Sequence, residues 1–165
     1  GLVVVLLAFF AMEGVSYLTH RFVMHGVGMR IHQRHHTNRD GGFELNDLYP
    51  VMFSSVAIMA FTAGTFLPSL RPLVLVGAGV TLYGAAYLFV HEIYIHRRLG
   101  PLSRPYRLLE WMKSCHRIHH LYGGEPYGML LPVVPRELRE RAEAVPYDPL
   151  LDVRARPSRG PVAVT

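Results

Sequence analysis

The segment PLVLVGAGVTLYGAAYLFVHEIYIH, residues 72–96, decides the fold of this chain. It carries no charged residue from Pro72 to Val90, and it then ends in the pattern HEIYIH. A helix of about 19 residues rises about 28 Å, close to the bilayer hydrocarbon thickness of about 30 Å. The segment therefore predicts a membrane-spanning helix that carries two histidines at one end.

Two further segments have the same character. From Gly1 to Thr19 the only charge is Glu13, and from Leu48 to Leu70 there is none. The alternative of three buried helices in a soluble protein is disfavoured, because a domain of 165 residues is too small to cover them. A secretory signal peptide is a second alternative for the first segment, which lacks a basic beginning. We therefore expect an all-α integral membrane helical bundle of three to four spans.

The basic residues predict the orientation of these spans. Of 17 lysine and arginine residues, all but Arg71 fall outside the turn between the second and third spans. Because basic loops stay on the cytoplasmic side, residues 20–47 and everything after His91 are predicted to be cytoplasmic. Basic residues that avoid the apolar runs in this way are typical of a membrane protein whose cytoplasmic side meets lipid headgroups. We therefore expect membrane lipids as partners and no nucleic acid. We expect a bacterial cytoplasmic membrane protein with its histidines in a cytoplasmic cap.

The length of 165 residues favours one main domain. We expect a membrane domain over residues 1–135 and a basic cytoplasmic tail over 136–165, loose from Leu150 onwards. Residues 103–120 predict an amphipathic helix that lies at the membrane interface or packs on the cap. The single cysteine, Cys115, excludes an internal disulfide, a Cys-based zinc ribbon and an iron–sulfur cluster, and it is expected to be a buried, inert thiol.

The ten histidines all fall in four short motifs, two of the form HX4H and two of the form HX2HH. On a helix, HX2HH presents three imidazoles from one face. In HX4H the two rings lie about 140° apart on a straight helix, so we expect the second histidine of each pair near a helix end. The motifs comprise His20 and His25; His32, His35 and His36; His91 and His96; His116, His119 and His120.

These histidines predict a metal centre. A lone histidine is most often structural, but ten clustered neutral imidazoles lack donors for half their ring nitrogens. Ten ligands exceed the needs of one ion and suit two ions with about five protein ligands each. Imidazole binds zinc, copper, iron and nickel alike, so zinc is a possible substitute in purified protein. Four nearby carboxylates are candidates to accept the second imidazole N–H: Glu13 and Glu44, with Asp47 and Glu92 preferred.

The motifs resemble those of the bacterial beta-carotene hydroxylases (beta-carotene 3-hydroxylases) in the fatty acid hydroxylase superfamily. The resemblance covers roughly residues 13–135. Four histidine boxes favour this family over membrane desaturases and carotenoid ketolases. The motifs that carry it are HRFVMHG at 20–26, HQRHH at 32–36, FELNDLY at 43–49, HEIYIH at 91–96, HRIHH at 116–120 and YGML at 127–130.

The resemblance implies a non-haem di-iron monooxygenase that uses O2 to hydroxylate C3 and C3′ of beta-ionone rings. It would convert beta-carotene to beta-cryptoxanthin and zeaxanthin, with all ten histidines as ligands to two iron ions. Ile93 stands where relatives tend to carry glycine, a departure that bears on acceptance of 4-keto rings on a route to astaxanthin. No further catalytic residue is expected beyond the metal centre.

Electrons must come from outside, because the chain has no flavin, haem or iron–sulfur motif. A ferredoxin with its reductase is the expected donor, steered by basic residues: Arg97, Arg98, Arg104, Arg107 and Lys113. The alternative is that these residues only follow the positive-inside rule or contact lipid headgroups. The carotenoid substrate would reach the metals from the bilayer between the spans. Candidate wall residues for its path are Phe22, Met24, Tyr83, Tyr87, Phe89 and Tyr94.

Three alternatives stay open. A membrane fatty acid or sterol hydroxylase would share the metal site but not the substrate. A histidine-rich metal transporter or sensor would place polar ligands near mid-membrane rather than at span ends. A bis-histidine haem carrier would leave six or more histidines unexplained.

Overall fold

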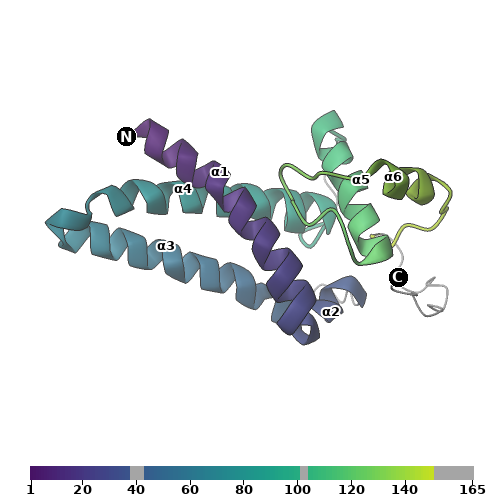
Figure 1. The fold of residues 1–165 in the computed structure, drawn as a ribbon, viewed down its shortest axis with the longest axis horizontal. Helices are drawn as coiled ribbons and strands as arrows, with labels where there is room; N and C mark the ends of the chain where they lie inside the picture. Colours follow the sequence, from purple (N-terminus) through teal and green to yellow (C-terminus); the bar gives the residue numbers. More distant parts are fainter. Residues whose placement is uncertain (38–42, 101–103, 151–165) are drawn as a thin grey trace.

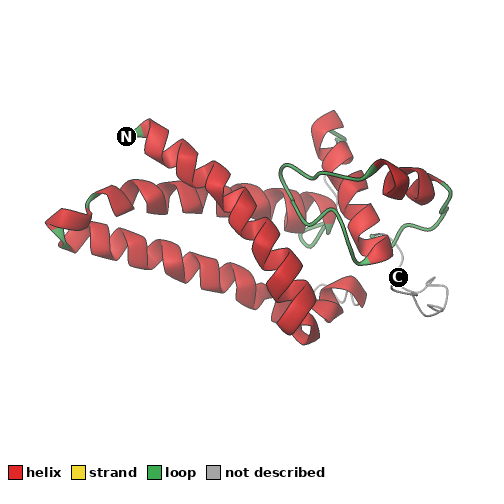
Figure 2. Ribbon diagram, in the orientation of Figure 1, coloured by secondary structure: helices red, strands yellow, loops and turns green. Residues whose placement is uncertain are grey.

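The computed structural model describes residues 1–37, 43–100 and 104–150. Within these ranges the chain consists of helices and loops, without a strand, as Figure 2 shows. The prediction of an all-α membrane protein is confirmed. Residues beyond 150, where the loose tail was expected, lie outside the described part.

Three helical units of the described chain are long and apolar enough to cross a membrane. The first is α1 (Leu2–Leu18), which continues into the π-helix η1 (Thr19–Val27). The second is α3 (Leu48–Phe66), and the third is α4 (Pro72–Tyr87) with the π-helix η4 (Leu88–Ile95). The 3-10 turn η3 (Pro68–Leu70) joins α3 to α4, and Pro72 opens α4 at a position where its missing N–H costs nothing.

Helix α4 packs against both α1 and α3 (Figure 1). A glycine lies at each of these contacts. A Cβ on Gly79 would lie 2.5 Å from the carbonyl oxygen of Val5, and one on Gly64 would lie 2.8 Å from the backbone nitrogen of Val74. These glycines therefore let the helix backbones approach closely, as small residues do in membrane bundles.

The cap at one end of the spans contains α2 (Met29–Thr37), η2 (Leu45–Asp47), α5 (Arg107–Tyr122) and α6 (Arg136–Glu143). Figure 1 shows α5 running across the direction of α3 and α4. The helix ends at Gly123, whose φ of 67° is the left-handed conformation that glycine adopts readily.

Helix α5 is shorter than predicted, and its buried face lies further along the chain. It begins at Arg107, with Tyr106 as N-cap, and Ser103 lies outside the described residues. Leu108, expected on the apolar face, is 61% exposed, because the helix buries its second half around the histidines. Cys115 is buried as expected, and burial raises the pKa of its thiol, which keeps it unreactive.

The apolar core of the cap joins η4 to α5 and to the chain that follows α6. Its buried members include Ile95, Met112 and Leu150. The guanidinium of Arg117 donates hydrogen bonds to the carbonyl groups of Ala142, Val145 and Tyr147. Residues up to Leu150 are therefore tied to α5, while the domain boundary after residue 135 stays a prediction.

Candidate metal centre

The four histidine motifs come together where the spans meet the cap. His20 and His25 lie on η1, the second motif lies on α2, His91 lies on η4 with His96 as its C-cap, and the fourth motif lies on α5. All but two of the ten histidines are buried, and the other two, His25 and His96, are half-buried. Segments far apart in the sequence thus supply one compact cluster.

The π-helices explain the HX4H spacing. A π turn closes hydrogen bonds from residue i to i+5, which brings residues five apart onto one side. The backbone N–H of His96 donates to the carbonyl of His91 at 2.9 Å, and the ring centroids of these residues lie 4.5 Å apart. His20 and His25 have centroids 5.0 Å apart in the same way. The sequence reasoning treated these segments as straight α-helices and missed the π turn, although the spacing itself was the signal.

The second histidine of each pair does lie near a helix end, as expected. Gly26, directly after His25, has φ of −104° and ψ of −114°, which is outside the helical region. His96 is the residue at which η4 stops. The break after His25 turns the chain so that α2 begins at Met29 and faces η1 with its own histidines.

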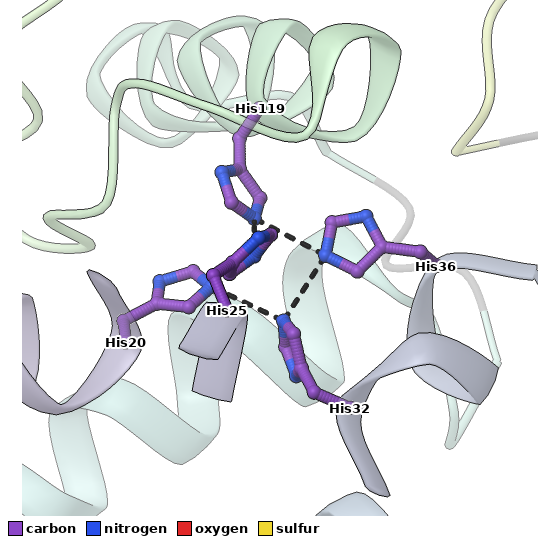
Figure 3. A group of neighbouring side chains, drawn as sticks. All are labelled: His20, His25, His32, His36 and His119. Atoms are coloured by element: carbon purple, nitrogen blue, oxygen red, sulfur yellow. Dashed lines mark hydrogen bonds between the residues drawn. The ribbon is translucent and has the colours of Figure 1, made fainter. Parts of the chain in front are cut away.

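The imidazoles form two groups in which the ligand atoms lie within 4.8 Å of one another. Figure 3 shows the first, the five-histidine group, in which rings from η1, α2 and α5 point toward one centre. Its members are His20, His25, His32, His36 and His119. The second, the four-histidine group, contains His35, His91, His96 and His116.

His120 is in neither group but lies beside both. Its Nε2 approaches Nε2 of His116 at 2.9 Å, and its ring stacks on that of His36 with centroids 4.3 Å apart. The structure therefore brings all ten predicted residues into one cluster and divides nine of them between two centres.

The donor chemistry of both groups fits a metal ion. Around the five-histidine group, Nε2 atoms face each other at 3.0 to 3.2 Å, for example His36 and His32 at 3.0 Å. Burial lowers the pKa of His32 to about 3 and lowers the pKa values of His116 and His119 well below the ordinary range. These rings are therefore neutral near pH 7 and offer lone pairs, which is the form of histidine that binds metals.

In the five-histidine group, neutral oxygens hold the rings from behind. Nδ1 of His20 lies 2.9 Å from the carbonyl oxygen of Tyr127, and Nδ1 of His119 lies 2.6 Å from that of Gly124. Nδ1 of His32 lies 2.7 Å from Oδ1 of Asn46. When Nδ1–H donates to these oxygens, Nε2 is left as the metal-binding atom.

In the four-histidine group, carboxylates take this place. Nδ1 of His91 lies 2.6 Å from Oε1 of Glu92, and Nδ1 of His35 lies 3.4 Å from Oε2 of Glu44. Glu92 is buried, and it also accepts a hydrogen bond from the guanidinium of Arg98 at 3.0 Å. Arg98 in turn donates to both carboxylate oxygens of Asp47, at 2.6 and 2.9 Å, and this pairing raises the pKa of Arg98.

Three expectations from the sequence need correction here. Asp47 was preferred as a direct partner of an imidazole, but its carboxylate instead binds Arg98 and the backbone N–H of Glu44. Glu13 lies on α1, where it binds Tyr83 and backbone N–H groups. Arg98 was expected on a donor-docking surface, yet it is partly buried between two carboxylates. Arg98 lies 51 residues from Asp47, and Met129 lies 116 residues from Glu13, so these pairings could not be predicted from the sequence.

The sequence reasoning also missed two kinds of partner. Asn46 lies in FELNDLY beside the carboxylates that the sequence indicated, but it was not predicted as a partner of His32. The carbonyl groups of Gly124 and Tyr127 have no signal in the residue types, because any residue offers a backbone oxygen.

A cavity of about 540 Å³ lies between α1, α3 and α4. Its walls are mainly apolar, and it ends at Asn46 and Glu92, the partners of His32 and His91. Of the expected wall residues, Met24, Tyr83 and Tyr87 line this cavity. The other three do not belong to its lining: Phe22 and Phe89 are exposed on the outer surface of the spans, and Tyr94 is buried in the core of the cap.

Known proteins place this site in a family. A beta-carotene hydroxylase from Pseudescherichia vulneris is 40% identical over 141 residues, covering 82% of this chain and 79% of its own. One from Pantoea ananas is 36% identical over 74% of this chain and 69% of its own. A chloroplastic beta-carotene 3-hydroxylase from Haematococcus lacustris is 39% identical, and this chain spans 41% of its length.

No solved structure matches the chain. The family model described as fatty acid hydroxylase matches residues 5–137, a range that contains all ten histidines. The chain therefore belongs to the fatty acid hydroxylase family.

Proposed function

We propose that this protein is a membrane carotenoid hydroxylase that inserts oxygen from O2 at C3 and C3′ of beta-ionone rings. Its products from beta-carotene would be beta-cryptoxanthin and then zeaxanthin. The observation that carries the proposal is an apolar cavity between the spans that ends at Asn46 and Glu92, which hold a histidine of each group. Relatives named beta-carotene hydroxylase, 36–40% identical over most of this chain, support the choice of substrate.

The five-histidine and four-histidine groups would each hold one iron ion, with His120 beside both. Iron held there would supply the activation of O2 that hydroxylation of a C–H bond requires. The overall reaction consumes one O2, two electrons and two protons, and it yields the alcohol and water. The carboxylates and carbonyls behind the imidazoles keep Nδ1 protonated, so that the Nε2 atoms stay aimed at the ions.

The cavity walls would bind and orient the substrate. Apolar side chains from three helices surround it, including Phe53, Ile58 and Val80. A hydrocarbon ring with the adjoining polyene suits such a lining, and the enclosure keeps water from the reacting carbon. Because the cavity lies at the depth of the spans, the substrate would enter from the bilayer rather than from the aqueous phase.

The membrane and the electron source are part of the same proposal. The distribution of arginines favours the bacterial cytoplasmic membrane with the histidine cap inside. A ferredoxin with its reductase would supply the electrons. Arg97, Arg104 and Arg107 are exposed beside the cap and would attract an acidic donor. We keep residues 1–135 as the di-iron domain and 136–165 as a basic extension.

The test is pigment extraction from a bacterium that accumulates beta-carotene, with and without this chain and with its His35→Ala variant. We expect zeaxanthin and beta-cryptoxanthin only with the intact chain. Iron in the purified membrane protein is measured alongside. If beta-carotene is unchanged while the protein is in the membrane with its iron, the carotenoid assignment is wrong, and fatty acids and sterols become the substrates to assay.

A further inference from the structure

Glu13 is a charged residue inside the first span, and its partners lie far away in the sequence. Between Gly1 and Thr19 it is the only charge. Ionisable side chains at such positions are costly unless they are paired, and they usually have a role. Its partners lie between 70 and 118 residues further along the chain.

Four donors surround the Glu13 carboxylate. Its Oε1 accepts from the backbone N–H groups of Met129 at 2.9 Å and Leu131 at 3.0 Å. The N–H of Leu130 lies 3.2 Å from both oxygens, and the hydroxyl of Tyr83 on α4 donates to Oε2 at 2.7 Å. Three successive N–H groups that point at one anion form a nest, which binds a carboxylate through the backbone.

These N–H groups belong to a segment that we call the strap, residues 123–131. The strap crosses the five-histidine group and supplies the carbonyls of Gly124 and Tyr127 that bind His119 and His20. The ring of Tyr127 lies against His25, with centroids 5.2 Å apart. The strap thus has one end on the imidazoles and the other end on Glu13.

Gly128 shows how closely the strap packs against the Glu13 carboxylate. A Cβ at this position would lie 2.9 Å from Oε1 of Glu13 and 3.2 Å from the carbonyl oxygen of Leu131. A side chain at residue 128 would therefore push the carboxylate away from the nest. A second tie, from Glu125 to Tyr17 at 2.7 Å and Arg21 at 3.0 Å, holds the middle of the strap against the same helix unit.

We propose that Glu13 is a positioning residue for the five-histidine group, acting through the strap. By holding residues 129–131 it fixes where the carbonyls of Gly124 and Tyr127 lie, and so fixes the rings of His119 and His20. The consequence for metal binding rests on the proposed function, in which each group holds an ion. The four-histidine group has its own carboxylate partners and does not depend on the strap.

The experiment uses Glu13→Gln in the full chain, purified in detergent and loaded with ferrous iron. An amide removes the negative charge and offers one acceptor oxygen where four donors converge, so the anchor of the strap is weakened. Loss of an outer partner of a metal ligand typically weakens affinity by about 10- to 100-fold. Because Glu13 acts on these partners and not on the ligands, we expect a loss no larger than this for one of two ions, measured by chelator competition and iron per chain, with unchanged affinity for the other. Hydrogen exchange should rise at the amides of residues 129–131.

Glu110→Gln is the matched control. Glu110 also accepts from a tyrosine, Tyr94, at 2.6 Å, but it lies outside both histidine groups and should change neither iron nor exchange in the strap. Tyr83→Phe removes one of the four donors, leaves the carboxylate in place, and should give a smaller loss at the same ion. It replaces Glu13→Gln as the test if the latter does not fold.

The outcomes separate the two proposals. If the unmodified chain does not bind two ions, the di-iron proposal fails, whereas the exchange of residues 129–131 still tests the anchor. A cooperative thermal transition shows that the Glu13→Gln variant is folded. If this variant binds both ions with unchanged affinity, Glu13 does not position the five-histidine group. Equal weakening of both ions, or unchanged exchange in the strap, also overturns the proposal.

Discussion

The five-histidine and four-histidine groups use the same side chain but are held in different ways. Behind the first stand neutral oxygens, from Asn46 and two backbone carbonyls. Behind the second stand the carboxylates of Glu92 and Glu44. A carboxylate partner raises the basicity of an imidazole as a metal ligand and offsets the charge of a bound cation. The two groups therefore offer different environments to an ion, although the histidine motifs that build them are nearly alike.

The groups also differ in how far their supports lie along the chain. Glu92 is adjacent to His91, and Glu44 is nine residues from His35. In the five-histidine group, Gly124 and Asn46 lie 5 and 14 residues from the rings that they support, but the carbonyl that binds His20 is 107 residues away, on the strap. Both carboxylates of the four-histidine group are therefore local, whereas one support of the five-histidine group depends on the packing of the strap against the first span.

The largest expected effect comes from removing a histidine of either group. His91→Ala leaves three histidines in the four-histidine group, so the chain should retain one iron by elemental analysis. His119→Ala leaves four histidines in the five-histidine group, so it should weaken the binding of that ion. Because hydroxylation needs both ions in our proposal, His91→Ala should form no detectable zeaxanthin in cells that accumulate beta-carotene, and His119→Ala should form less than the intact chain. Unchanged zeaxanthin with either variant would contradict the requirement for both ions.

Acidification should weaken the metal-free protein. Burial lowers the pKa of His32 to about 3 and lowers that of His36, His116 and His119. Between that range and the ordinary value near 6.5, the unfolded chain binds protons that the folded chain does not, so stability falls as pH falls. The slope is about 1.4 kcal/mol per pH unit for each such histidine.

The measurement is the thermal transition of the metal-free protein in detergent at pH 7.5 and pH 5, with the iron-loaded protein as control. Bound metal also holds the imidazoles deprotonated, so the loaded protein should be more stable at each pH but should lose at least as much stability between the two. A metal-free protein whose stability is flat between these pH values would contradict the neutral, buried state of the rings.

Removing the carboxylate behind His91 should weaken one group selectively. In Glu92→Gln the buried amide still accepts a hydrogen bond, but the negative charge between His91 and Arg98 is gone. We expect about 10- to 100-fold weaker binding of one ion, by chelator competition. Glu44→Gln, whose contact to His35 is longer at 3.4 Å, provides a milder comparison within the same group. Equal weakening of both ions would remove the distinction between the groups.

The smallest effect is expected at Asn46. Asn46→Leu removes the acceptor behind His32 and should weaken the ion of the five-histidine group by about tenfold. Asn46→Asp instead places a carboxylate there and should tighten this ion, making the group resemble its neighbour. Both variants are compared by iron affinity at pH 7.5. If Asn46→Asp weakens binding, the charge of the partner is not what separates the two groups.

Much of the architecture was readable from local patterns. Uncharged runs such as 72–90 predicted the three spans because hydrocarbon tolerates only apolar side chains around a closed backbone. The histidine spacing predicted a two-centre metal site, and the HX4H pairs predicted helix ends. The direction in which their rings meet was missed, because the π turns that align His91 with His96 were not anticipated.

The outer partners of the imidazoles were predicted less well. Glu92 was predicted to accept a hydrogen bond from an imidazole, and its carboxylate does lie beside Nδ1 of His91. Asp47 was predicted to do the same because it lies near a histidine motif, but it binds Arg98 instead. Proximity in sequence is a weak guide here, since a carboxylate takes the strongest donor within reach. A guanidinium with two parallel N–H groups outcompetes a neutral imidazole for it.

By itself, the sequence determined the class of this protein: an all-helical membrane protein with ten histidines in four motifs outside the apolar runs, in a family that its motifs already indicated. Those features follow from residue type and spacing alone. Only the tertiary structure decided how the histidines divide into two groups. It also decided that Glu13 binds the strap and not an imidazole of the metal centre. The reason is physical. Backbone carbonyls and N–H groups carry no residue-specific signal, so their partners emerge only when distant segments pack together.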